Sequence, residues 1–309
     1  MMDNRFVFRD SCPACLTQTS NIIFRSSFTA PPISDYLEAF YAPQGRIDLG
    51  SLEGGQYELV ECQHCSLIFQ RTILADRMMH RLYEEWIDPV RSLAIYEAET
   101  GIRQALDQIR QIADMLQFIG RPAKQIQALD YGMGWGHWCR LAAAMNIHVQ
   151  GCELSLAKAA HAATFGIKNL SIQEIHSHAF DFINVDQVLE HLAHPLETLI
   201  ELVQTLRPDG LVRISVPDGR NIGKRLRSAD WSAPKEAQQS LNPVAPLEHV
   251  NCFNYASLLC MTSKAGLEPV SIPSRYAFSC TGRIKSLLRP LYYFLRGAPG
   301  TTHYFRRSE

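Results

Sequence analysis

Four of the nine cysteines form two closely spaced pairs in the first quarter of the chain. The pairs are Cys12 with Cys15 and Cys62 with Cys65, each with the spacing C-x2-C. Such a pair straddles a tight turn, and four thiolates complete the tetrahedron that a structural Zn2+ ion requires. The 46 residues between the pairs exceed the usual gap of roughly 15–20. A structural zinc site is therefore predicted from the spacing within each pair, and four unligated thiols are the alternative.

A glycine-rich segment, 130–136, is predicted to lie where a strand turns into a helix. It reads D-Y-G-M-G-W-G, and its glycines let the backbone turn tightly and let a ligand approach main-chain N–H groups. The spacing G-x-G-x-G differs from the G-x-G-x-x-G of dinucleotide-binding loops. Glu153 ends the next predicted strand, 21 residues after Gly132. A carboxylate at that place can accept both hydroxyls of a ribose.

The glycine spacing, with Asp130 two positions before the first glycine, resembles motif I of the class I S-adenosylmethionine-dependent methyltransferases. The resemblance continues from Phe180 to Pro217 through V-L-E-H-L and L-R-P-D-G, and 248–253 is similar to the family segment E-H-V-N-x-F. It covers roughly residues 97–275, about 60% of the chain. It implies a Rossmann-like, seven-stranded, doubly wound α/β sheet. The residues that it implies for binding S-adenosylmethionine are Asp130, Gly132, Gly134, Gly136, Glu153 and Gln187.

The cysteine pairs carry a second resemblance. The strand-like Leu67-Ile68-Phe69 follows the second pair, as in the N-terminal zinc-binding module of bacterial sugar and natural-product methyltransferases. Ser66 stands where that module often has glycine. The resemblance implies a small zinc-ribbon-like domain ahead of the methyltransferase domain.

Two histidines stand in the segments that resemble the family. Methyl transfer from a sulfonium is an in-line displacement, in which the protein aligns the acceptor and supplies a base where one is needed. A histidine with a pKa near neutrality suits that task for a hydroxyl or an acidic carbon. His191 and His249 are therefore the candidate bases, and bracing of the cofactor loop is the alternative role for His191. The expected reaction is methylation of an oxygen, or a carbon, of a sugar or natural-product intermediate.

Two other functions compete with this hypothesis. Zinc ribbons also bind nucleic acid, which would make the chain a binding protein with a catalytically inactive methyltransferase fold. The complete set of glycines and acids argues against inactivity, and the scarcity of basic residues around the cysteines argues against a nucleic-acid partner. A nicotinamide-dependent dehydrogenase is disfavoured by the glycine spacing.

The elements that must position these residues follow from the hydrophobic pattern. Apolar residues at spacings of 3 and 4 predict a helix over 102–119, which Gly120 ends. From Gln125 onward strands and helices alternate, with one short strand at 169–172, and this pattern is typical of a parallel sheet with crossover helices. The predicted domains are a zinc-ribbon-like domain at 1–75, a helical connector at 76–124, a methyltransferase domain at 125–282 with a substrate cap at about 218–248, and a basic-apolar tail at 283–309.

The 30 basic and 31 acidic residues give a net charge of −1, but they are distributed unevenly along the chain. Residues 275–309 hold seven basic residues and one acidic residue, so this part is +6 and the rest is 23 − 30 = −7. Basic and large apolar residues interleave in 283–297. This pattern indicates either a segment that rests weakly on an anionic membrane or a terminal helix packed on the domain.

The remaining expectations concern partners and location. No run reaches the 18 or more apolar residues of a membrane-spanning helix, and no signal peptide is evident. We therefore expect a cytoplasmic enzyme. Its cysteines are odd in number, which argues against a disulfide framework. Basic residues in the predicted cap, such as Arg220 and Lys224, would suit an anionic small-molecule substrate. The oligomeric state is left open.

Overall fold

The chain forms two compact units, each assembled from stretches that are distant in the sequence. The computed structural model describes residues 5–235, 237–272 and 301–308. Each predicted domain is one continuous stretch of sequence, whereas the chain passes between the two units several times. The first unit contains Met1–Glu99, Val188–Leu199 and Pro217–Lys264, and the second unit contains Thr100–Gln187, Ile200–Val216 and Ala265–Glu309.

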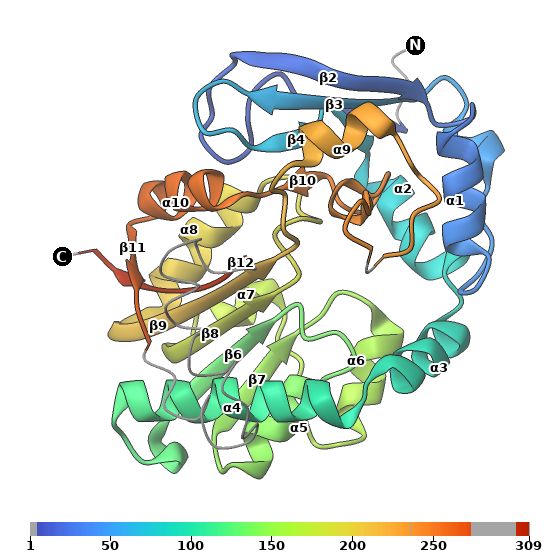
Figure 1. Cartoon of the computed structure of the whole chain (residues 1–309). Coiled ribbons are helices and arrows are strands. Elements are labelled where there is room, and N and C mark those ends of the chain that lie inside the picture. The colour runs from blue at the N-terminus through green and yellow to red at the C-terminus, as the bar shows by residue number, and fades with distance from the viewer. Residues whose placement is uncertain (1–4, 236, 273–300, 309) are drawn as a thin grey trace, which may run out of the picture. The chain divides into compact units, whose positions relative to one another are not determined.

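A six-stranded sheet forms the centre of the second unit (Figure 1). Its strands are β6 (Gln127–Tyr131), β7 (His148–Cys152), β8 (Phe180–Asp186), β9 (Leu206–Val216), β11 (Leu267–Val270) and β12 (Thr301–Arg307). Their order is β11-β12-β9-β8-β6-β7. The four strands from β6 to β9 are parallel, and β12 is antiparallel to both of its neighbours. The predicted α/β class with a mainly parallel, Rossmann-like sheet is confirmed.

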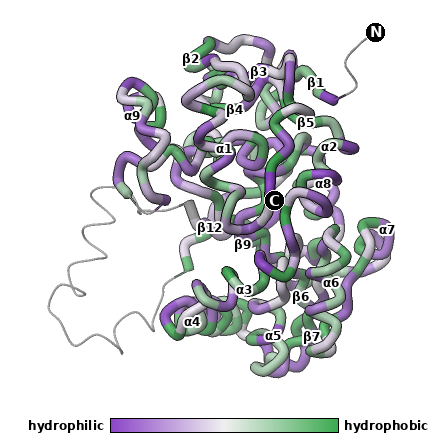
Figure 2. The backbone as a smooth tube through the Cα atoms, turned by 90° about the vertical axis from the view of Figure 1, so that its right-hand side faces the viewer, coloured by the Kyte–Doolittle hydropathy of each residue, from purple (hydrophilic) through white to green (hydrophobic). Residues whose placement is uncertain are grey.

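Helices pack on this sheet through one apolar core. They include α4 (Ile102–Ile119), α5 (His137–Ala144) and α6 (Leu156–Ala163), and the 3-10 turn η3 (Ala123–Gln125) leads from α4 into β6. Apolar and polar residues alternate along α4 (Figure 2). Its buried Ile112 and Met115 share the core with Trp138 of α5 and Phe182 of β8. As predicted, α4 ends at Gly120, which adopts the left-handed conformation that glycine favours at a helix end.

The segment predicted as a strand at 169–172 pairs with the sheet at one residue only. Asn169 forms a single parallel bridge with Gly151, and the short helix α7 (Ile172–Ile175) begins immediately afterwards. Ser171 and Glu174 form a capping box at the start of α7, which satisfies two backbone N–H groups and stabilises a helix here. The described sheet therefore has six strands where seven were expected.

A buried polar network crosses the middle of the sheet beneath the glycine-rich segment. Asp130 of β6 accepts a hydrogen bond from Asn184 Nδ2 of β8 at 2.8 Å. Arg213 of β9, 3% exposed, donates to Asn184 Oδ1 at 2.7 Å and lies 3.4 Å from Asp186 Oδ2. Burial raises the pKa of Asp130 to about 7 because an isolated carboxylate loses its hydration there.

The first unit contains two small antiparallel sheets. The strands are β1 (Phe6–Phe8), β2 (Ser20–Ser27), β3 (Gln56–Cys62), β4 (Ile68–Gln70), β5 (Thr72–Leu74) and β10 (Asn251–Cys252). One sheet has the order β10-β4-β3-β2 and the other pairs β1 with β5. Because β10 lies just after the predicted substrate cap of about 218–248 and β4 follows the second cysteine pair, a segment next to the cap and the zinc-ribbon-like segment share one sheet. This pairing explains why the first unit is not a contiguous N-terminal domain.

Short helices complete the first unit. Many of them share an apolar core with the sheet, in which Phe28, Tyr57 and Trp231 bring aromatic rings together. The helix α8 (Pro195–Thr205) begins in the first unit and ends in the second. The other helices are α1 (Ile33–Tyr41), η1 (Leu49–Leu52), α2 (Asp76–Arg81), the π-helical turn η2 (Leu82–Trp86), α3 (Pro89–Glu99), α9 (Ile222–Ser228), η4 (Asn242–Val244) and α10 (Tyr255–Lys264).

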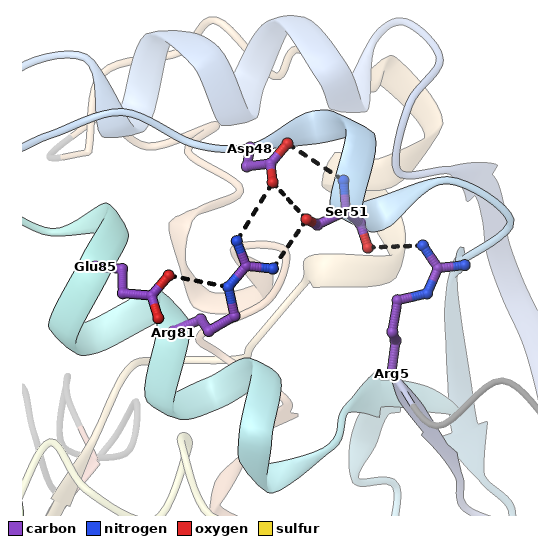
Figure 3. A network of polar contacts seen from close by, with 5 residues as sticks. All are labelled: Arg5, Asp48, Ser51, Arg81 and Glu85. Carbon is purple, nitrogen blue, oxygen red and sulfur yellow. Dashed lines mark hydrogen bonds and ion pairs between the residues drawn. The ribbon is translucent and has the colours of Figure 1, made fainter.

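Arg81 links η1 to the α2–η2 helix pair (Figure 3). It pairs with Asp48 at 3.5 Å and with Glu85 at 3.0 Å, and it donates to Ser51 Oγ at 3.0 Å. Arg5 donates to the Ser51 carbonyl at 3.1 Å from the other side. Asp48 and Glu85 also line a cavity of about 940 Å³ in the first unit. None of the predicted site residues is among those that line this cavity.

The end of the chain contributes a strand to the sheet of the second unit. The basic-apolar segment 283–297, for which a membrane contact and a packed terminal helix were the two alternatives, lies outside the described residues. Beyond it, Arg306 of β12 pairs with Glu268 of β11 at 2.6 Å, and Arg307 donates to the carbonyl of Gln204 at 3.2 Å. Two of the seven basic residues at 275–307 therefore have partners in the protein. Among the described helices, none is both long and apolar enough to cross a bilayer.

The raised pKa of Asp130 predicts a measurable dependence of stability on pH. Between the unfolded pKa of about 3.9 and the folded pKa of about 7, the folded state keeps a proton that the unfolded chain has lost. The free energy of unfolding therefore falls as pH rises through this window. In Asp130→Asn the position stays neutral and can still accept the Asn184 hydrogen bond. From pH 5 to pH 8, urea unfolding should show the wild type losing roughly 3 kcal/mol relative to the variant. Identical pH profiles for the two proteins would contradict the assignment.

Candidate cofactor site and cysteine cluster

The structure brings the four predicted zinc ligands together in the first unit. The Sγ atoms of Cys12 and Cys65 are 3.6 Å apart, and those of Cys15 and Cys62 are 3.5 Å apart. All four sulfur atoms lie within 4.8 Å of one another, and all four residues are buried. Four thiolates around Zn2+ at about 2.3 Å would be separated by about 3.8 Å along each edge of the tetrahedron. The arrangement of the four thiols is therefore close to the one that a Zn2+ ion requires.

Each cysteine pair has the same backbone turn. The N–H of Leu16 donates to the Cys12 carbonyl at 2.8 Å, and the N–H of Ser66 donates to the Cys62 carbonyl at 3.0 Å. Leu16 has φ of 65° and Ser66 has φ of 61°, a left-handed conformation in which glycine is favoured. This backbone requirement is the physical reason why glycine often stands at the position of Ser66. The two turns thus present their thiols toward a common centre.

A buried arginine holds the segments next to this cluster. Arg9 donates to the Gln70 carbonyl at 2.9 Å and 2.6 Å, to the Val250 carbonyl at 2.6 Å and to Asn251 Oδ1 at 2.8 Å. Burial lowers the pKa of Arg9 to about 9. Charge-assisted hydrogen bonds to carbonyl oxygens offset part of the desolvation cost of the guanidinium. We call this set of contacts the Arg9–Asn251 clasp.

The clasp extends to the segment that carries His191. Asn251 Nδ2 donates to the carbonyls of Leu189 at 2.9 Å and Leu192 at 2.7 Å, and its backbone N–H donates to the Glu190 carbonyl at 3.0 Å. Three hydrogen bonds from one residue therefore bracket Glu190 and His191. Asn251 positions these side chains without belonging to the predicted set of site residues.

In the second unit the glycine-rich segment forms a tight turn between β6 and α5. Gly132, Gly134 and Gly136 all have positive φ, of 75°, 54° and 78°. A Cβ atom at Gly136 would lie 2.9 Å from Cβ of Ala162 in α6, whereas one at Gly134 would meet no atom within 4 Å. Gly136 therefore permits close packing of the helices, while Gly134 leaves open space beside the main chain.

Glu153 is held against this turn. Its Oε2 accepts a hydrogen bond from the N–H of Gly134 at 3.0 Å, and its Oε1 accepts one from the N–H of Ser155 at 2.8 Å. Asn169 clamps its backbone from the other side, through contacts at 2.8 Å and 3.1 Å. A carboxylate has about four acceptor positions, so each oxygen can accept a further hydrogen bond. The structure therefore brings Glu153 and the glycine turn together.

Two other predicted cofactor residues lie at the ends of neighbouring strands. Gln187 follows β8 and has φ of 56°, which is uncommon for a residue with a side chain. Its N–H donates to the Ser215 carbonyl at 2.8 Å, and its Nε2 donates to Ser215 Oγ at 3.1 Å. Asp130 is only 3% exposed, and its side chain belongs to the buried polar network below the glycine turn. Asp130 thus braces the glycine segment from inside the sheet.

The two predicted bases lie side by side in the first unit. The rings of His191 and His249 have centroids 4.9 Å apart in an edge-to-face arrangement. Nδ1 of His249 lies 2.5 Å from the Asn242 carbonyl, so this nitrogen is the donor and Nε2 carries the lone pair. Burial of the ring lowers the pKa of His249 to about 4. His191 is partly buried, with Nδ1 3.5 Å from the hydroxyl of Tyr83.

Sequence reasoning missed the positioning residues Arg9, Asn251 and Asn169. In the sequence, Arg9 is only one of the few basic residues near the cysteines. Asn251 was part of the segment 248–253 but was assigned no role. A polar residue between apolar neighbours, as in V-N-C-F, is a signal for a buried hydrogen-bonded side chain, although it does not identify the partners.

Comparisons with known proteins found one matching family model and several similar solved structures. A family described as "Methyltransferase domain" matches residues 103–272, more than half of the chain. Among solved structures, the plantazolicin methyltransferase BpumL in complex with SAH is 16% identical, covers 74% of this chain and 93% of its own, and has a TM-score of 0.48. A putative sarcosine dimethylglycine methyltransferase from Galdieria sulphuraria is 18% identical, with coverages of 68% and 89% and a TM-score of 0.43.

A third structure is the 1,6-didemethyltoxoflavin-N1-methyltransferase of Burkholderia thailandensis. It is 17% identical, covers 72% of this chain and 87% of its own, and has a TM-score of 0.43. No curated protein matches the sequence. On the family match over residues 103–272, the chain belongs to the methyltransferase family and is a class I S-adenosylmethionine-dependent methyltransferase.

Proposed function

We propose that the enzyme methylates an oxygen, or a carbon, of a small molecule such as a sugar or natural-product intermediate. The observation that carries this proposal is the His191–His249 pair, whose rings lie 4.9 Å apart although 57 residues separate them in the sequence. Hydroxyl and carbon acceptors must lose a proton when they are methylated, and imidazole is the side chain suited to remove it. We assign the removal of that proton to this pair.

S-Adenosylmethionine supplies the methyl group, whose bond to the sulfonium breaks with the electron pair left on sulfur as the bond to the acceptor forms. The residues proposed to hold the cofactor are in the second unit. Glu153 has acceptor positions left for two ribose hydroxyls beyond its bonds to Gly134 and Ser155. Leu154, an apolar side chain that is 78% exposed, is the adjacent candidate for covering the adenine ring. Gln187 completes the set at the end of β8.

The four cysteines are proposed to bind one structural Zn2+ ion. Their sulfur separations of 3.5 and 3.6 Å support tetrahedral coordination, and the paired backbone turns hold the thiols in that arrangement. The ion would stabilise the first unit, because the four thiolates come together only in the folded state. The free energy of metal binding therefore adds to the free energy of folding.

The basic residues of the predicted cap differ in how far they support an anionic substrate. Arg220 is bound to Asp218, with its Nη2 2.7 Å from the carboxylate, and Arg225 donates to the Ser240 carbonyl at 3.0 Å. These two cations are therefore used within the first unit. Lys224 and Arg227 of α9 are exposed and are the better candidates to contact an anionic group of the substrate.

Replacing Glu153 by Gln should weaken binding of S-adenosylmethionine by about 1–3 kcal/mol, because hydrogen bonds to a charged acceptor are lost. Isothermal titration calorimetry measures this change directly. Glu174→Gln is the matched control, because Glu174 is an exposed acid in the same unit and forms the capping box of α7. This variant should bind S-adenosylmethionine as tightly as the wild type does. Unchanged affinity in the Glu153 variant, or tight binding of NAD by the wild type, would contradict the cofactor assignment.

Replacing His191 or His249 by Ala should lower turnover by on the order of 10²–10⁴-fold, the usual contribution of a general base. Turnover is measured as S-adenosylhomocysteine released with the hydroxylated acceptor that supports the fastest rate. Affinity for S-adenosylmethionine should stay unchanged, because the proposed cofactor residues are in the other unit. If both variants keep full turnover, the proton is removed elsewhere.

After weakly held metals are removed, purified protein should contain one zinc ion per chain by elemental analysis. Cys12→Ser and Cys62→Ser should each contain well under one, because a three-thiolate site binds the ion more weakly. Cys260→Ser is the control, since Cys260 of α10 lies outside the cluster, and it should retain the full zinc content. Rapid alkylation of all four cluster cysteines in the native protein would rule out a bound ion.

A further inference from the structure

Glu190, His191 and His249 bring three donor atoms together in the first unit. One donor atom from each residue lies within 4.8 Å of the other two, and His191 Nε2 is 3.9 Å from Glu190 Oε1. An ion centred among the three atoms would lie about 2.8 Å or less from each. Side-chain movements of well under 1 Å would give the distances of about 2.0–2.2 Å at which imidazole and carboxylate bind first-row metals.

Each imidazole is oriented by a contact to its other nitrogen. His249 donates from Nδ1 to the Asn242 carbonyl at 2.5 Å, and Nδ1 of His191 faces the Tyr83 hydroxyl at 3.5 Å. A histidine that binds a metal typically uses its second nitrogen in this way, which fixes the ring and its tautomer. In His249 this contact leaves Nε2 as the nitrogen able to bind a metal, and in His191 it is Nε2 that lies 3.9 Å from Glu190 Oε1.

The backbone that carries two of the donors is held in place. Asn251 brackets Glu190 and His191 through hydrogen bonds to the carbonyls of residues 189, 190 and 192. The Glu190 side chain is fully buried. Two imidazoles and one buried carboxylate on a rigid backbone form a donor set typical of first-row divalent cations.

We propose that Glu190, His191 and His249 bind one first-row divalent cation, in addition to the zinc assigned to the cysteines. The proposal rests on the function proposed above and has the histidine pair act through the metal. A nitrogen that binds the cation cannot also accept a proton, so the two imidazoles serve as ligands and not as the base itself. The bound cation coordinates the acceptor hydroxyl and lowers its pKa, so that its proton leaves to water and the oxygen becomes the nucleophile. The cation itself undergoes no change of oxidation state.

Manganese distinguishes this site from the cysteine cluster, because Mn2+ favours nitrogen and oxygen ligands over thiolates. Mn2+ is titrated into the zinc-loaded protein, and the free ion is followed by its electron paramagnetic resonance signal. The wild type should bind one Mn2+ per chain. Glu190→Gln and His191→Gln should each weaken this binding by more than tenfold. His194→Gln, which changes an exposed histidine of the same segment paired with Glu197, should bind Mn2+ as the wild type does.

Retained zinc and unchanged affinity for S-adenosylmethionine show that a variant is folded. Two results would overturn the cation site: no Mn2+ binding by the folded wild type, or equal binding by the wild type and Glu190→Gln. Full turnover after removal of Mn2+ and other weakly held metals would show that the cation has no role in catalysis. The methyltransferase proposal would then remain intact. Failure to bind S-adenosylmethionine would instead refute the proposed cofactor site, while Mn2+ binding remains measurable.

Discussion

The Arg9–Asn251 clasp is the contact on which the first unit depends. A buried guanidinium has five N–H donors and loses its hydration, so its hydrogen bonds must be made within the protein. Arg9 finds its acceptors on β4 and β10, two strands that are about 180 residues apart in the chain. The requirement to satisfy one buried cation therefore joins the N-terminal segment to the segment that follows the predicted substrate cap.

The same clasp links the cysteine cluster to the histidine pair. Arg9 precedes the first cysteine pair by three residues, and β4 begins three residues after the second pair. On its other side, Asn251 holds the backbone of Glu190 and His191. A metal ion bound by the cysteines would stiffen the strands that carry the clasp. The zinc-ribbon-like segment thus has a structural reason to accompany this methyltransferase domain, because it supports side chains proposed to act in the reaction.

The second unit follows a different principle. The glycine turn, Glu153 and Asn169 lie within 40 residues of one another, and their contacts are made between adjacent strands and the turns that follow them. The buried network of Asp130, Asn184 and Arg213 then ties β6, β8 and β9 together below the turn. The network holds the turn in place while Glu153 and the main chain remain able to bind a ligand.

By itself the sequence determined what depends on near neighbours along the chain. The period of α4, the alternation from β6 to β9, the glycine turn with Glu153 and the spacing within each cysteine pair are all local patterns, set by backbone geometry. Only the tertiary structure decided that the 169–172 segment makes a single bridge, that residues 301–307 enter the sheet, and that Asp130 points inward. It alone placed Asn251 beside His191 and brought His191 to His249. These outcomes depend on hydrogen bonds and packing between distant segments, because a buried polar group can be satisfied by many partners and no local pattern specifies which one.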